Sequence, residues 1–422
     1  MLKLRGFFEN ELTNNILSFW LPRCVDEVNG GYFNCFDNLG KNLVSRDKYT
    51  WSQGRFVWVF SKLAMMDCGT FTEKERKHFL DLAKKGRDFL EKHCLLGEDD
   101  WRCVFLMDET GKHKYVEGWD RLDMSIYADC FVIAAFAKYS LAANHQESYL
   151  FAKKLYQSAV DRVKSGNFTT LPYPLSPQYR AHGIPMIFSN TTKEVYEAAL
   201  KFDAEFCAEL KENLSNFTSD ILTNFVDENK ILHEIISADN GFIDNILGQH
   251  VNPGHTLEDV WFIIDAGDIL DRSDFIQEAI AIAAKTFEIG WDTEYGGLLH
   301  YCGLDGGEPV GSSEGVEQEA MYRQLEGWAD KLWWVHSEAL YTSLLCFDRT
   351  KEQKFLEHFD KVFAYTFEKF PNPDREIREW VQILRRDGKP TDKVVALPVK
   401  DPYHIMRNLI QIIELLYNMT KE

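Results

Sequence analysis

The feature that most constrains the fold is a regular alternation of short aromatic segments with long helical ones. The short segments are rich in aromatic or β-branched residues and end in Asp or Gly turns, a pattern typical of strands and hairpins. They are residues 30–40, 100–111, 240–244, 296–307 and 379–388. In the long segments apolar residues recur three and four apart, as at Val57, Phe60, Leu63 and Ala64, which predicts helices.

A helix is expected to begin after each hairpin. The expected starts lie near Ser52, Met124, Gly183, His255, Leu332 and Tyr403. Their spacing averages roughly 70 residues, enough for two helices and a hairpin, although the third hairpin around residues 167–174 is poorly defined. We therefore predict an all-α fold: an (α/α)6 barrel, a toroid of six helical hairpins with short β-hairpins at one mouth, in a single domain over residues 1–422. An open helical solenoid is the alternative, but its usual repeat is shorter, roughly 33–47 residues.

Two kinds of helix support this prediction. Residues 124–143 are apolar nearly all round, as expected of a helix in an inner ring. Residues 72–93 have a charged face and suit an outer position. In such a ring the starts of the inner helices surround one mouth, so polar residues there would converge on a pocket.

Composition excludes several functions. The net charge of −19 argues against nucleic acid and anionic membranes as partners. The longest apolar core run, residues 130–137, is too short to span a bilayer, and residues 1–15 lack the apolar stretch of a signal peptide. Nine cysteines without a CxxC pair indicate reduced core residues, a cytoplasmic location and no cysteine-based zinc site.

The first and fourth helix starts carry candidate catalytic groups. Arg55 lies one turn into its helix beside Trp51 and could clamp a substrate oxygen, or it could form a structural ion pair. His255 follows the turn Asn252-Pro253-Gly254 and shares a helical face with Glu258. A neutral imidazole can take a proton at pH 7 and a nearby carboxylate can orient it, although both residues could simply favour the helix start.

The fifth and sixth starts carry further candidates. Trp333 and Trp334 offer flat surfaces on which sugars stack, or they could be core residues. His336 and Glu338 are two residues apart and do not share a helical face, so we expect at most one of them to point into a pocket. At the sixth start, His404 follows a proline that suits the first helical turn.

The third helix start carries two polar residues, and several common catalytic motifs are absent from the sequence. Arg180 and His182 precede a proline-containing helix entry and could bind a polar substrate group or be ordinary loop residues. The sequence lacks a P-loop, a Rossmann GxGxxG, an HExxH and a GxSxG motif. A redox cofactor, a zinc peptidase and a serine hydrolase are therefore not expected.

Four of these segments resemble the N-acylglucosamine 2-epimerase family, whose mammalian members are also called renin-binding proteins. They are KYTWSQGRFVW, NPGHTLEDVWF, KLWWVHSEAL, and EWVQILRRDGKP with the following PYHIMR, and they occur in family order across residues 29–416. Cellobiose 2-epimerases, mannose epimerases and sulfoquinovose isomerase are related. The resemblance implies an (α/α)6 barrel and the activity of a carbohydrate isomerase.

The resemblance also implies roles for individual residues. His255 and His404 would be the catalytic pair, Arg55 would hold sugar oxygens, and Glu258 and Glu338 would assist. Independently of these roles, we predict substrate contacts from Trp51, His182, Asn252, Trp333, Trp334 and His336. The C2–H of an open-chain aldose is acidic beside the aldehyde, so one histidine can remove it and the other can reprotonate the opposite face. No metal or cofactor is required for this chemistry.

The identity of the sugar depends on a few positions. His336 looks like the acetylglucosamine epimerases, because the cellobiose and isomerase branches more often carry Gln there. His182 and Met186 also favour that branch, whereas DPYHIMR looks closer to the cellobiose or isomerase form. We expect a 2-epimerase for N-acetylglucosamine and N-acetylmannosamine. The alternatives are a mannose or cellobiose 2-epimerase, an aldose–ketose isomerase, a hydrolase on the same toroid and a non-catalytic binding protein.

Two further expectations concern regulation and assembly. The resemblance implies ATP as an allosteric effector that is not consumed, although the sequence shows no local ATP motif. The aromatic content of 14% is compatible with a homodimer. The expected partner is a small sugar, with neither nucleic acid nor membrane.

Overall fold

The structure is a computed structural model that describes residues 1–394 and 397–421. Contacts between Cα atoms divide the chain into two compact units. The first unit comprises Met1–Pro172, Asn190–Lys211 and Ala396–Thr420, and the second comprises Tyr173–Ser189, Glu212–Val395 and Lys421–Glu422. That residues 1–422 form a single domain stays a prediction.

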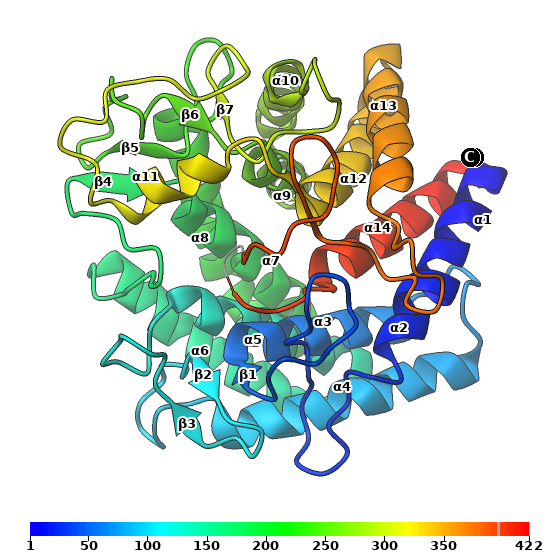
Figure 1. Cartoon of the computed structure of the whole chain (residues 1–422). Helices are drawn as coiled ribbons and strands as arrows, with labels where there is room; N and C mark the ends of the chain where they lie inside the picture. Colours follow the sequence, from blue (N-terminus) through cyan, green and yellow to red (C-terminus); the bar gives the residue numbers. More distant parts are fainter. Residues whose placement is uncertain (395–396, 422) are drawn as a thin grey trace. The chain divides into compact units, whose positions relative to one another are not determined.

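The first unit is mainly helical (Figure 1). Its elements are α1 (Leu2–Asn10), η1 (Glu11–Leu17), α2 (Ser18–Trp20), β1 (Lys48–Tyr49), α3 (Thr50–Met65), α4 (Glu73–His93), β2 (Leu106–Met107), β3 (His113–Lys114), α5 (Ile126–Ala143), α6 (Gln146–Lys164) and α14 (Tyr403–Met419). Helix α3 packs against α4 and α5, and α1 packs against α14 although the two are far apart in sequence. The N-terminal helix is thus the partner of the last helix.

The second unit repeats the pattern of long helices and very short strands. Its elements are β4 (Tyr179–Ala181), η3 (Ile221–Phe225), β5 (Ile235–Ser237), β6 (His250–Val251), α9 (Pro253–Leu270), α10 (Ser273–Gly290), β7 (Cys302–Gly303), α11 (Ala320–Gln324), η4 (Leu325–Gly327), β8 (Lys331–Leu332), α12 (Trp333–Thr350), α13 (Gln353–Lys369) and β9 (Ile383–Leu384). Helix α9 packs against α10 and α12. Helices α7 (Gly183–Phe202) and α8 (Cys207–Asp220), with η2 (Ala204–Phe206) between them, contain residues of both units.

The predicted helices are present, and local chemistry explains their ends. Helix α4 begins after a capping box in which Thr72 and Glu75 satisfy each other's backbone N–H groups. Helix α5 is buried over most of its circumference, as its apolar sequence predicts, and ends at Asn144 in the left-handed conformation. The six expected helix starts correspond to the first residues of α3, α5, α7, α9, α12 and α14 within two residues.

The strands are much shorter than predicted. Each named strand spans two or three residues, and they pair antiparallel as β1–β2–β3, β4–β5, β6–β7 and β8–β9. Segments 30–40 and 240–244 contain no named strand, and the first holds only isolated bridges such as Phe36–Leu43. Glycines with positive φ and turns capped by aspartate side chains interrupt the ladders before they can lengthen.

Helix α5 also bears on the question of membrane association. It is the one described helix long and apolar enough to cross a membrane by length and composition, and it extends the apolar run predicted at 130–137. Because 78% of this stretch is buried inside the protein, it behaves as a core helix. Eight of the nine cysteines are likewise buried, as predicted for core residues.

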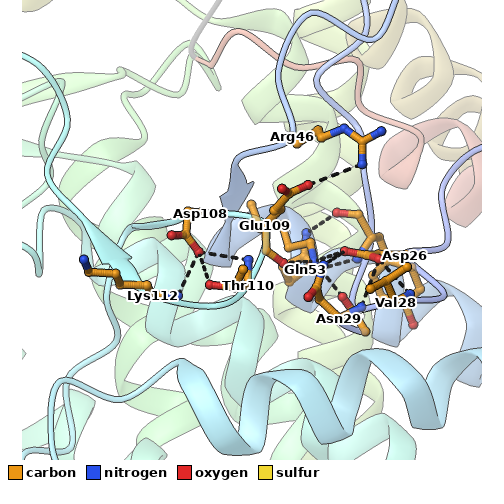
Figure 2. Close-up of polar contacts among 12 residues, drawn as sticks. Asp26, Val28, Asn29, Arg46, Gln53, Asp108, Glu109, Thr110 and Lys112 are labelled. Carbon is orange, nitrogen blue, oxygen red and sulfur yellow. Dashed lines mark hydrogen bonds and ion pairs between the residues drawn. The ribbon is translucent and has the colours of Figure 1, made fainter.

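A buried lysine–aspartate ion pair, Lys48 with Asp26, connects a turn to the start of α3. The Nζ of buried Lys48 donates to Asp26 and to the carbonyl of Gly30, each at 2.7 Å, and to the carbonyl of Glu109 at 2.7 Å. Figure 2 shows the turn, in which Asp26 accepts hydrogen bonds from the backbone N–H groups of Val28 and Asn29. All three ammonium donors are satisfied, which allows this lysine to be buried without an unpaired donor.

The second unit contains a buried lysine–aspartate ion pair of the same kind, Lys331 with Asp292. Buried Lys331 donates to Asp292 at 2.9 Å and to the carbonyl of Gly297 at 3.4 Å. In both copies a Gly-Gly pair with positive φ begins four residues after the aspartate, and the aspartate N–H donates to the carbonyl of the second glycine. Burial lowers the pKa of Lys331 to about 8, although the hydrogen bond to Asp292 opposes this shift.

Candidate active site

The start of α9 positions His255 through its own turn. The side chain of Asn252 accepts a hydrogen bond from the backbone N–H of His255 at 3.1 Å, and Pro253 occupies the first helical position. A Cβ on Gly254 would lie 2.4 Å from the ring of Trp334, so only glycine lets the turn approach that indole. The N-cap of α9 is Asn252 and not His255. The side chain of His255 is 35% exposed, which leaves it accessible.

The carboxylate that orients His255 is Glu234. The Nδ1 of His255 lies 2.8 Å from Oε1 of Glu234 and 3.2 Å from the amide nitrogen of Asn252. The sequence instead predicted Glu258 as the nearby acid, because i and i+3 share a helical face. Glu234 was missed because it lies just before β5, and local spacing gives no signal for a residue brought in from another segment.

Glu234 also faces His182. The second oxygen of Glu234 lies 3.7 Å from Nδ1 of His182, and Nε2 of His182 lies 2.8 Å from Oδ2 of Asp259. The backbone N–H of His182 donates to the carbonyl of Glu234 at 2.9 Å. All three side chains are buried. His182 is therefore part of a buried ionic cluster and not an ordinary loop residue, and its contact with substrate stays a prediction.

Charge governs the protonation of this cluster. Burial alone would lower the pKa of His182, but the hydrogen bond to Asp259 and the negative charge of Glu234 outweigh it and raise the pKa to about 9. Burial would raise the pKa of Glu234, yet the charge of His255 and the contacts with His182 hold it well below its usual range. Burial opposes protonation of His255, but the charge of Glu234 prevails and raises the pKa of His255.

Glu258 and Glu338 form a second acidic pair in this unit. Both are buried, and a carboxylate oxygen of one lies within 4.8 Å of an oxygen of the other. The indole Nε1 of Trp261 donates to Glu338 at 3.0 Å. Paired carboxylates can exchange protons with a bound molecule or hold a cation. The assisting role of both residues stays a prediction.

The tryptophans of α12 have different surroundings. Trp334 lies with its ring centroid 5.3 Å from that of His255 at an interplanar angle of 39°. Both Trp333 and Trp334 are buried in the free protein, with less than a tenth of their surface exposed. Trp334 therefore lines one face of His255, and its contact with a sugar stays a prediction. Trp333 has the burial expected of the core alternative.

The surroundings of His336 favour a structural role, and its contact with substrate stays a prediction. The ring is fully buried and stacks on Tyr365. Its Nε2 accepts from the backbone N–H of Leu298 at 3.0 Å, and its Nδ1 lies 2.8 Å from the carbonyl of Leu332. Both ring nitrogens are used by the backbone, and burial lowers the pKa of His336 to about 3, so it is a neutral structural residue.

Two other positions also prove structural. His250 lies buried in β6 with Nδ1 3.2 Å from the carbonyl of Ile246. Arg180 forms an ion pair with Asp220 at 2.5 Å and a hydrogen bond with Asn240. These contacts favour the ordinary structural alternative for Arg180 over a substrate contact.

In the first unit, His404 lies between two arginines. Its Nε2 is 3.4 Å from Nη2 of Arg55, and its Nδ1 is 3.3 Å from Nη2 of Arg407. Asp401 forms an ion pair with Arg55, and its Oδ1 accepts from the N–H of Tyr403 at 2.8 Å, which orders the first turn of α14. Arg407 and Asp401 were missed, although Arg407 lies one helical turn beyond His404.

Arg55 is enclosed by aromatic rings. Its guanidinium carbon lies 5.0 Å from the ring centroid of Trp51, 4.2 Å from that of Phe131 and 4.9 Å from that of Tyr403. Such contacts favour a guanidinium held in one orientation. Arg55 therefore lies beside His404 and also forms an ion pair with Asp401, so the sugar contact and the structural ion pair expected of Arg55 are not exclusive. Half-buried Trp51 stacks on Phe131, and its contact with a sugar stays a prediction.

The fold of this chain is shared with solved sugar epimerases. Cellobiose 2-epimerase from Bacillus thermoamylovorans aligns with a TM-score of 0.79, covering 98% of this chain and 100% of that chain, at 21% sequence identity. Identity this low shows a shared fold alone, and it confirms the predicted all-α, α/α-barrel fold with short antiparallel strand pairs.

Sequence similarity then identifies the family. The profile of the N-acylglucosamine 2-epimerase (GlcNAc 2-epimerase) family matches residues 31–408, and the chain belongs to this family. N-acylglucosamine 2-epimerase from Bos taurus is 29% identical over 413 residues, 96% of this chain and 90% of the bovine protein. Cellobiose 2-epimerase from Eubacterium cellulosolvens is 22% identical, covering 96% of each chain. The predicted family and the prediction of a carbohydrate isomerase are confirmed.

Proposed function

We propose that this chain is a sugar 2-epimerase that interconverts N-acetylglucosamine and N-acetylmannosamine. The observation that carries the proposal is the pair of histidines in contrasting settings, His255 beside the carboxylate of Glu234 and His404 between the guanidinium groups of Arg55 and Arg407. Proton removal and return at one carbon need two such groups. The greater identity to the bovine N-acylglucosamine epimerase than to the cellobiose epimerase supports this sugar.

The chemistry follows from the residue types. In the open-chain sugar, one histidine takes the C2 proton, and the electrons of the broken C–H bond move into an enediolate whose oxygen becomes negative. Arg55, already held by Asp401 and three aromatic rings, can stabilise that oxygen without reorganising. The other histidine then donates its proton to the opposite face of C2, which inverts the centre.

Ring opening requires an acid and a base of its own. The buried pair Glu258 and Glu338 is our proposal for this step, because two adjacent carboxylates can carry one proton to the ring oxygen and take one from the anomeric hydroxyl. Residue chemistry alone completes the cycle, and ATP would act only as an effector. A cytoplasmic location and a homodimer remain part of the proposal.

A panel of free sugars in D2O tests the proposal. The expected result is deuterium at C2 of N-acetylglucosamine with appearance of N-acetylmannosamine by NMR, and loss of both signals in His255→Ala and His404→Ala. Epimerisation of mannose or cellobiose alone, or formation of a ketose, would select another branch of the family. A new reducing end would indicate a hydrolase. Full activity in either histidine variant would overturn the two-histidine mechanism, and binding without exchange at C2 would indicate a non-catalytic member.

A further inference from the structure

Four ionisable side chains of the second unit form a continuous array. In order they are Asp259, His182, Glu234 and His255, joined by contacts of 2.8, 3.7 and 2.8 Å. The first three are buried, and only His255 reaches solvent. The array therefore runs from the core of the unit to the accessible imidazole.

The charges of the buried part do not cancel by themselves. Two carboxylates, on Asp259 and Glu234, enclose one imidazolium, on His182, and leave one net negative charge below His255. Burying an unbalanced charge is costly, and a proton on His255 removes the imbalance. The array thus stabilises the imidazolium that forms when His255 accepts a proton from the substrate.

The direction of the Glu234 contact decides the tautomer of His255. Glu234 can only accept a hydrogen bond when ionised, so Nδ1 of His255 must carry the proton. Nε2 is then the basic atom, on the opposite side of the ring. Asn252 accepts from the backbone N–H of His255, and Trp334 lies against the ring face, so the backbone and the ring of His255 are both held in place.

We infer that Glu234 is the positioning residue of His255, and that buried His182 holds Glu234 in place. This inference rests on the proposed function, because it assigns His255 Nε2 to proton transfer at C2. His182 keeps Glu234 ionised and aligned through one contact to its side chain and one to its backbone carbonyl. Asp259 in turn binds the far nitrogen of His182.

Other charged groups facing His255 are accounted for. Glu258 on α9 and His182 near α7 act on its charge in opposite directions. His300, after α10, is buried, and burial together with the charge of His255 lowers the pKa of His300 to about 3. His300 is therefore neutral at pH 7, and Glu234 remains the anion in hydrogen-bond contact.

The test is a histidine NMR titration of the whole protein labelled at the imidazole carbons. Glu234→Gln keeps the size of the side chain and removes its charge, so the midpoint of His255 should fall by about one pH unit. The matched control is Glu194→Gln, another buried glutamate paired with a cation, Lys138, in the first unit. This control should leave the His255 midpoint unchanged.

Steady-state kinetics of Glu234 variants provide a second, independent test. Glu234→Gln should lower kcat roughly 100-fold with KM within about threefold, because orientation of the base is lost and sugar contacts are kept. Glu234→Asp, which keeps the charge but shortens the reach, should lower kcat about tenfold. If Glu234→Gln does not fold, this second variant carries the test.

The results distinguish the positioning role of Glu234 from the proposed epimerase function. An unmoved His255 midpoint in Glu234→Gln, or wild-type kcat in Glu234→Asp, would overturn the positioning role. If the wild-type protein exchanges no C2 proton in any sugar, the proposed function fails, whereas the titration still decides whether Glu234 controls His255.

Discussion

Gln53 in α3 and His336 in α12 accept equivalent backbone hydrogen bonds, each beside a buried lysine–aspartate ion pair. Each lies five residues after the lysine of that ion pair, Lys48 or Lys331. Each accepts a hydrogen bond from the backbone N–H that follows a Gly-Gly pair, Gln53 from Tyr32 at 2.7 Å and His336 from Leu298 at 3.0 Å. The correspondence explains why a histidine in a family motif belongs to the scaffold.

This relationship predicts that His336→Gln is tolerated. A glutamine oxygen can replace the imidazole nitrogen as the acceptor, as Gln53 already does, so kcat/KM should stay within about threefold. His336→Ala should lower the free energy of unfolding by about 1–3 kcal/mol, because a buried N–H loses its acceptor and a ring is removed. Urea denaturation and steady-state kinetics check both values. A large loss of kcat in a stable His336→Gln protein would return His336 to the active site.

The turn before His255 should not accept a larger residue. In Gly254→Ala the new methyl group would lie 2.4 Å from Trp334. Overpacking of this kind costs about 1–3 kcal/mol, and displacing the indole should also lower activity. Gly6→Ala is the matched control, since a Cβ there has nothing within 4 Å and lies in a helix. The control should stabilise the protein by up to about 1 kcal/mol. Equal effects of the two changes on thermal unfolding would contradict the close contact.

The buried imidazolium of His182 should make stability depend on pH. Its pKa is about 9 in the folded chain and near 6.5 when unfolded. A raised pKa stabilises the fold fully below pH 6.5, and this stabilisation is lost as pH rises through 9. The difference is on the order of 2–3 kcal/mol.

Urea titrations at pH 6.5 and 9.5 measure this change. His182→Gln should remove most of the difference between the two pH values and should be less stable than wild type at pH 6.5, because two buried carboxylates lose their cation. A wild-type protein whose stability rises between pH 6.5 and 9.5 would contradict an ionised His182.

Arg55 should not be replaceable by lysine. Lys carries the charge but lacks the planar fork that reaches Asp401 and His404 together. We expect Arg55→Lys to lower kcat by about 10- to 100-fold, in the range that loss of a positioned charge produces. Arg349→Lys, at an ion pair with Asp268 on an exposed surface, is the control and should keep kcat near wild type. Similar kcat values for both variants would argue against a role for the Arg55 fork.

The sequence alone determined the periodic parts of this protein. The spacing of apolar residues placed the helix starts within two residues. Helices are local structures, and apolar residues three and four positions apart form their buried face. It also singled out His255, Arg55 and His404, since each follows a recognisable turn or helix start. The strand lengths were overestimated, because short-range β preference does not show where a turn or a capped aspartate ends a ladder.

The tertiary structure decided which partners those residues have. Glu234 and Asp259 reach His182 from positions 52 and 77 residues away along the chain, so no local pattern could join them. Helical spacing pointed to Glu258 as the acid of His255, but the carboxylate that hydrogen-bonds its ring is Glu234, brought in from another segment. His336 was assigned to substrate because sequence shows a side chain and not its burial, and burial with both ring nitrogens bonded to backbone makes it part of the scaffold.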